Sequence, residues 1–92
     1  MNKIIIPTPL RKFTNNESSY FTSQDRVDLA MEDLAKAFPD IRVHLFDETE
    51  QFRSFINIFV GQEDIRGLQK GQTPLSGSET ISIIPAIAGG IL

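Results

Sequence analysis

The chain has 92 residues, 40% of them hydrophobic, and a formal net charge of −3 at pH 7. This length fits one domain with a single modest core, and the acidic balance argues against nucleic acid as a partner, because phosphates select basic surfaces. No apolar run approaches the roughly 18 residues of a membrane span, and the first residues lack the apolar core of a secretory signal. We therefore expect a cytoplasmic protein with no membrane partner.

Cysteine is absent, and His44 is the only histidine. Without cysteine there are no disulfides, thiolate metal sites or catalytic thiols, so any sulfur chemistry must use the end of the chain. A single histidine without a second one at metal-ligand spacing favours a structural or solvated role for His44. We therefore expect no metal site, no cofactor and no catalytic residue.

The first half of the chain predicts a β-hairpin followed by a helix. Residues 3–7 (KIIIP) are mostly β-branched and end at a proline, and residues 19–22 can return antiparallel to them after the turn-forming TNNESS. A helix is predicted over Gln24 to Ala37, with Ser23 as its N-cap. Its apolar stripe has helical spacing and comprises Val27, Ala30, Met31, Leu34, Ala35 and Phe38.

The second half predicts short strands joined by tight turns. In residues 41–46 the alternation of apolar side chains fits a strand, but their spacing from Phe38 also fits a helical turn, which we favour. The strongest strand signal is FINIFV, followed by a tight turn at Gly61-Gln62. The other predicted elements are a polar loop at 47–51 and strands at 55–60, 63–66 and 80–85.

Strand alternation sorts the side chains of FINIFV between two faces. The face that suits the helix carries the aliphatic set Ile56, Ile58 and Val60. Phe55 and Phe59 then share the other face, where Ile5 from the first strand can join them. We predict that Ile5, Phe55 and Phe59 form a partner-binding surface, the alternative being that loops cover them.

The last residues, AIAGGIL, carry a Gly89-Gly90 pair followed by Ile91 and Leu92. Glycine has no Cβ and adopts backbone conformations closed to other residues, which suits a tail that enters a narrow enzyme channel. Gly90 is amide-bonded to Ile91, however, so it has no free carboxylate in this chain.

The order IIIPTPLR, helix, FINIFVGQEDIR, LQ, TISIIPAIAGG resembles the ThiS/MoaD family of ubiquitin-like sulfur carriers. The segments IPTPLR and SIIPAIAGG are most similar to the carriers for sulfur amino acid or thioacid biosynthesis. The resemblance implies an α+β fold of the β-grasp type, with a mixed sheet packed on one main helix. It also implies a domain at residues 1–85 and a flexible tail at 86–92, of which Ile91-Leu92 is a removable extension.

The resemblance further implies a protein that is not an enzyme but a co-substrate of enzymes. A ubiquitin-activation-like adenylyltransferase would recognise Gly89 and Gly90, adenylate the Gly90 carboxylate and allow its conversion to a thiocarboxylate. A sulfide-accepting enzyme (a sulfhydrylase) would then use this sulfur for cysteine, homocysteine or related metabolites. A zinc metallopeptidase of the JAMM type would first cleave between Gly90 and Ile91, removing Ile91-Leu92.

Other functions remain open at this point. The chain could be the small subunit of a molybdopterin synthase, although the extension after Gly90 argues mildly against that role. It could be a ubiquitin-like modifier that forms isopeptide bonds with lysines, or a non-catalytic binding module that uses the exposed sheet face. Ile91 and Leu92 could also pack on the domain and never be removed.

Overall fold

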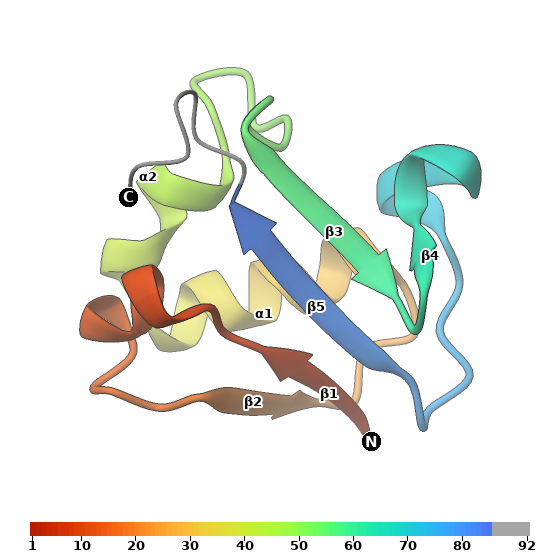
Figure 1. Ribbon diagram of the computed structural model, residues 1–92, viewed down its shortest axis with the longest axis horizontal. Helices are drawn as coiled ribbons and strands as arrows, with labels where there is room; N and C mark the ends of the chain where they lie inside the picture. The colour runs from red at the N-terminus through yellow and green to blue at the C-terminus, as the bar shows by residue number, and fades with distance from the viewer. Residues whose placement is uncertain (86–92) are drawn as a thin grey trace.

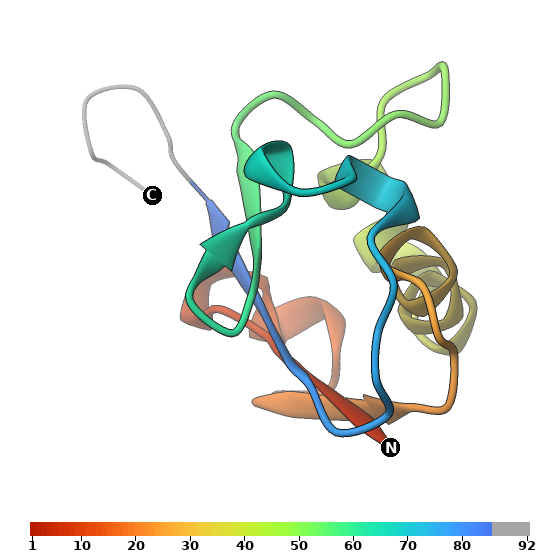
Figure 2. The ribbon, with the colours of Figure 1, turned by 90° about the vertical axis from the view of Figure 1, so that its right-hand side faces the viewer.

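The computed structural model describes residues 1–85, which form a single five-stranded sheet with helices on one face (Figures 1 and 2). The strands are β1 (Asn2–Ile5), β2 (Ser19–Thr22), β3 (Ile56–Val60), β4 (Glu63–Asp64) and β5 (Thr80–Pro85). Their spatial order is β2-β1-β5-β3-β4. The central strand, β5, runs parallel to its neighbour β1, and every other neighbouring pair is antiparallel, so the sheet is mixed as predicted.

The main helix lies behind the sheet in Figure 1 and beside it in Figure 2. The helical elements are α1 (Val27–Ala37), α2 (Arg42–Leu45) and four short 3-10 segments, η1 (Thr8–Phe13), η2 (Pro39–Ile41), η3 (Ile65–Gly67) and η4 (Lys70–Gln72). None of the helices in the described part of the chain is long and apolar enough to cross a membrane.

The core lies between α1 and the sheet. The predicted helix stripe is buried here except for the partly buried Phe38, which follows the end of α1, and Leu34 and Met31 are fully inaccessible to solvent. They belong to one apolar cluster with Ile56, Ile58 and Ile83 from β3 and β5. The alternation read from the sequence therefore assigned the core face of β3 correctly.

The helix begins later than predicted, at Val27 and not at Gln24, and the prediction of Ser23 as N-cap was wrong. The N-cap is Arg26, whose backbone is extended (φ −148°, ψ 144°) because it forms a β-bridge with Pro74. Pairing with this distant segment outweighs the local capping preference of serine, which acts only through one side-chain hydrogen bond.

The ends of three predicted strands also differ. The first strand ends at Ile5, β3 begins at Ile56 after Phe55, and the predicted strand at 63–66 is limited to Glu63–Asp64. The last difference has a clear cause, since the Asp64 carboxylate accepts a hydrogen bond from the backbone N–H of Arg66 at 2.9 Å and so caps η3. The predicted hairpin of β1 and β2, the helical turn in 41–46 and the strand at 80–85 are confirmed.

Candidate functional site

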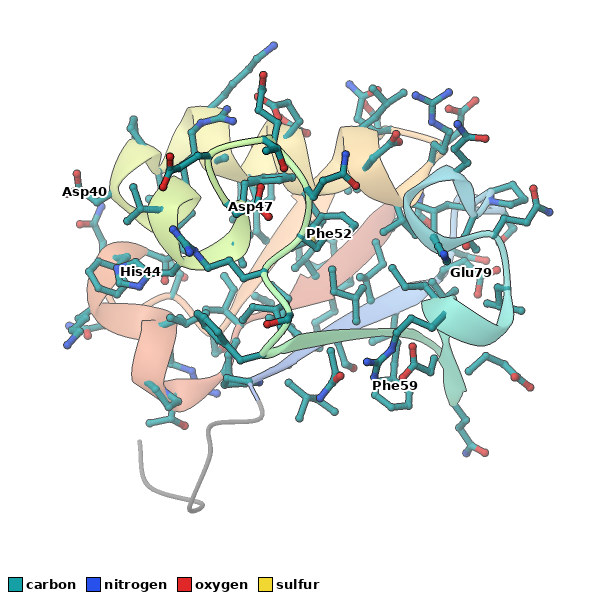
Figure 3. All side chains as sticks on the ribbon, turned by 90° about the horizontal axis from the view of Figure 1, so that it is seen from above. Asp40, His44, Asp47, Phe52, Phe59 and Glu79 are labelled. Atoms are coloured by element: carbon teal, nitrogen blue, oxygen red, sulfur yellow. The ribbon has the colours of Figure 1, made fainter. Side chains whose placement is uncertain are left out.

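The main helix α1 lies on one side of the sheet, and we call the opposite face the open face (Figure 2). The strand register places Ile5 opposite Ser82 of β5, and Ser82 opposite Phe59 of β3. Since neighbouring strands lie roughly 4.8 Å apart, Ile5 and Phe59 flank the small Ser82 at about 10 Å from each other. Phe59 projects away from the helices in Figure 3, as the alternation predicts.

Ile5 and Phe59 are half-buried side chains, so they offer part of their apolar surface to solvent. Phe55 is more exposed, at 38%, but it lies in the turn before β3, so strand alternation does not fix its direction. The structure therefore brings together Ile5 and Phe59 in one row across the sheet, and it places Phe55 beside the strand rather than in it.

The sequence reading missed two apolar residues of the open face. Ile84 of β5 is 47% exposed and lies opposite Asn57, and Phe21 of β2 is 56% exposed and lies opposite Lys3. The signal was present, because alternation in TISIIP puts Ile84 on the face away from the buried Ile83. The same argument applied to β2 would have identified Phe21.

A hydrogen-bonded group of polar side chains borders Phe59. Asp64 lies directly opposite Phe59 in the register, and its carboxylate pairs with the Arg66 guanidinium at 2.8 Å. The same guanidinium donates to the Asn57 side-chain oxygen from its Nη2 atom. Hydrogen bonding to Arg66 lowers the pKa of the Asp64 carboxyl group, and hydrogen bonding to Asp64 raises the pKa of Arg66. Both groups are therefore charged at neutral pH.

The strand β5 is the last element of the described part of the chain. Pro85, the last residue of β5, lies opposite Ile56 at the start of β3. The predicted processing and activation residues, Gly89, Gly90, Ile91 and Leu92, lie outside the described residues, and their roles remain predictions.

The described residues also contain a cleft and a single histidine. A cleft of about 520 Å³ lies on the α1 side of the sheet edge, between the 46–54 loop and η4; Asp64 and Arg66 are among its lining residues, whereas Ile5, Phe55 and Phe59 are not. His44 stacks on Phe13 with ring centroids 4.1 Å apart, which is a packing role. Residues 1–85 contain no group of three or more acidic or histidine side chains arranged to hold a metal ion.

A mixed five-stranded sheet with one main helix on one face is the architecture of a ubiquitin-like β-grasp protein. Residues 4–90 match the model of the ThiS family, and the chain belongs to that family. The resemblance and the fold read from the sequence are thus confirmed.

Individual relatives with known names or structures are similar to this chain over nearly its whole length. The sulfur carrier protein CysO of Mycobacterium tuberculosis is 32% identical over 89 residues, covering 95% of this chain and 96% of the relative. A crystal structure of the BexX/CysO complex of Amycolatopsis orientalis contains a chain with a TM-score of 0.89 and 31% identity, covering 98% of this chain and 100% of that one.

A third relative carries a different name. Small archaeal modifier protein 1 of Methanosarcina acetivorans has a TM-score of 0.83 and 25% identity, covering 97% of this chain and 95% of that one. The names of these relatives describe carriers and a modifier rather than catalysts, in agreement with the expectation that this chain is not an enzyme.

Proposed function

We propose that this protein is a sulfur carrier whose C-terminal glycine, Gly90, is converted to a thiocarboxylate after removal of Ile91-Leu92. The observation that carries the proposal is the match to the ThiS family, which ends at Gly90 and leaves Ile91 and Leu92 beyond the matched region. The similarity to CysO, which is named a sulfur carrier protein, points to the same role.

The chemistry needs only a free carboxylate at Gly90. An adenylyltransferase lets this carboxylate attack the α-phosphate of ATP with loss of pyrophosphate, and the resulting acyl-adenylate has AMP as a good leaving group. Hydrosulfide then displaces AMP and leaves sulfur on the Gly90 carbonyl carbon. A sulfide-accepting biosynthetic enzyme, such as a sulfhydrylase acting on an activated amino-acid precursor, would take the sulfur for cysteine, homocysteine or a related thio-metabolite.

The length of the last segment and the open face support this use of the chain. Residues 86–90, counted at roughly 3.3 Å each when extended, can reach about 16 Å beyond Pro85, far enough to enter an active site. The open face, with Ile5 and Phe59 at its centre, would hold the body of the protein against the activating or accepting enzyme. That a CysO occurs in a crystal structure with BexX supports complex formation with a second protein.

The extension makes the protein a precursor in this proposal. While Gly90 is bonded to Ile91 its carbonyl is an amide, which cannot attack ATP as a carboxylate does. A JAMM-type zinc metallopeptidase is the class of enzyme that would hydrolyse this bond, with a metal-activated water as nucleophile.

The test compares the 92-residue chain with a chain ending at Gly90. Each is mixed with the adenylyltransferase of the source organism, ATP and sulfide, and the C-terminus is examined by mass spectrometry. The shortened chain should exchange one oxygen for sulfur at Gly90, and the full chain should remain unchanged until a peptidase is added. Equal conversion of both chains without peptidase contradicts the mechanism.

A second candidate function, a ubiquitin-like modifier, is favoured by the similarity to small archaeal modifier protein 1. The same Gly90 acyl-adenylate would then react with a lysine amine instead of hydrosulfide. Conjugates of this chain joined through lysine in the native cell, without detectable thiocarboxylate, would select the modifier over the carrier.

A further inference from the structure

We infer that Arg66 is a specificity-determining residue of the open face, where it receives a carboxylate of the activating adenylyltransferase beside Phe59. This inference rests on the proposed function, because it assigns one partner to the face. It adds a residue outside the apolar surface and names the chemical group that the enzyme must present there.

The side chain of Arg66 is held in a fixed position at the border of the apolar surface. Its Nε atom lies 3.2 and 3.3 Å from the two carboxylate oxygens of Asp64, and its Nη2 atom lies 2.8 Å from one of them. Nη2 also donates to Asn57, which lies two residues before Phe59 on the same face of β3. Asp64 is opposite Phe59 in the register, so both residues that anchor the guanidinium are neighbours of Phe59 in the sheet.

This anchoring leaves donors of Arg66 available to a partner. A guanidinium has five N–H donors, and those of Nη1 make no hydrogen bond to any described residue. The side chain of Arg66 is 61% exposed even though it is anchored. A charge that is already positioned loses little conformational freedom on binding, which is why arginine is frequent among the residues that dominate interfaces.

The group that fits these donors is a carboxylate of the enzyme. A guanidinium pairs with carboxylate or phosphate oxygens, but the nucleotide would meet Gly90, and β5 ends at Pro85 beside the start of β3, whereas β4 pairs with the other end of β3. The whole chain has a net charge of −3, which attracts basic surfaces without selecting an orientation. One fixed guanidinium beside an apolar patch does select an orientation, because a partner without a hydrogen-bond acceptor at that point would leave the Nη1 donors of Arg66 unsatisfied in the interface.

A purely structural role for the Arg66 side chain predicts different behaviour. The cap of η3 uses the backbone N–H of residue 66, so it persists when the side chain is removed. The pair with Asp64 is exposed to solvent, where such pairs contribute little to stability. Arg66→Ala should therefore fold normally and show its effect in binding.

The experiment measures the dissociation constant of the complex between this protein and the adenylyltransferase of the source organism. It uses both the full chain and the chain ending at Gly90, without ATP, and each measurement is made at low and at high salt. Arg66→Ala should weaken binding about tenfold at low salt, with a smaller loss at high salt, because the contact is between exposed charges. Arg66→Lys should recover only part of this loss, since an ammonium lacks the planar fork. Asn57→Ala should give an intermediate loss.

Arg26 provides the matched control. It forms the same type of pair, with an aspartate two residues away, at 2.6 Å and 44% side-chain exposure, but it lies at the start of α1. Arg26→Ala should leave binding within about twofold of the unaltered chain. An unchanged dissociation constant for Arg66→Ala, or an equal loss for Arg26→Ala, overturns the inference.

The outcomes also separate this inference from the proposed function. If the unaltered chain binds the enzyme but the chain ending at Gly90 is not adenylated, the proposed carrier chemistry is rejected. The binding data then still decide whether Arg66 contributes to recognition of the enzyme. If the unaltered chain does not bind the enzyme at all, the docking role of the open face and that of Arg66 are both rejected.

Discussion

Ile58 and Phe59 are neighbours in β3 that face opposite sides of the sheet. Ile58 is 2% exposed within the core, whereas Phe59 is half-buried on the open face. One residue step along a strand thus separates a side chain that stabilises the fold from one that is available to a partner. Substitutions at these two positions should therefore affect different properties of the protein.

Phe59→Ala should weaken binding of the adenylyltransferase by about 1 to 4 kcal/mol, as truncation of a dominant aromatic contact does. Its effect on the free energy of unfolding should be smaller, because part of the ring is already in solvent. Ile58→Ala is the control, and it should cost about 2 to 5 kcal/mol of stability. Titration calorimetry measures the effect on binding, and urea unfolding measures the effect on stability. If the Phe59→Ala protein unfolds while its folded fraction binds normally, Phe59 is a core residue and not a docking residue.

Leu34 and Leu29 make a similar pair on α1. Leu34 is fully buried against the sheet, and Leu29 is 38% exposed on the same helix. Leu34→Ala should lower the free energy of unfolding by about 2 to 5 kcal/mol, because it removes buried methyl groups and leaves a cavity. Leu29→Ala should cost less than about 1 kcal/mol in the same urea titration. Equal losses at both positions would contradict the packing of α1 described above.

Among the elements, the turn between β3 and β4 depends on one glycine. Gly61 has φ of +61°, and no atom lies within 4 Å of the position that a Cβ would occupy. Gly61→Ala should therefore destabilise by about 1 to 2 kcal/mol through backbone strain rather than a clash. Gly67 also has open space around it but no positive φ, so Gly67→Ala should stay within about 0.5 kcal/mol. Thermal unfolding of the two variants tests this difference.

Elements whose signal is local could be predicted from the sequence. The stripe of α1 and the alternation of β3 each follow from a repeating burial pattern, and both are confirmed. The start of α1 could not be predicted, because Arg26 is held extended by Pro74, a residue distant in the sequence. The side-chain contact between Arg66 and Asn57 was likewise invisible, since it depends on how η3 folds back against β3.

The candidate site also has parts that could be predicted from the sequence and parts that could not. Alternation placed Ile5 and Phe59 on one face, but their common row depends on the parallel pairing of β1 with β5, which only the structure gives. Ile84 could have been found from alternation in β5 and was missed. The glycine pair at 89–90 was read from sequence alone and lies outside the described residues.

At the scale of the whole molecule, we predict that residues 1–85 fold without the last seven residues. The buried apolar cluster extends from Ile4 to Ile83, and β5 is paired on both sides, with β1 and β3. In the proposed function the body docks through the open face and residues 86–90 supply the reacting group. These two tasks should then be separable by truncation.

A chain ending at Pro85 should unfold at nearly the same temperature as the full chain, because the buried cluster and all five strands remain. It cannot be adenylated at Gly90, yet it keeps the open face, so it should inhibit activation of the Gly90-ending chain competitively with respect to that chain. Its affinity should be lower than that of the longer chain, since linked contacts reinforce one another and the tail contacts are gone. Phe59→Ala in the same truncated chain should weaken the inhibition, which ties the effect to the open face. A well-folded 1–85 chain that fails to inhibit even at high concentration would place recognition in the tail and remove the role proposed for the sheet.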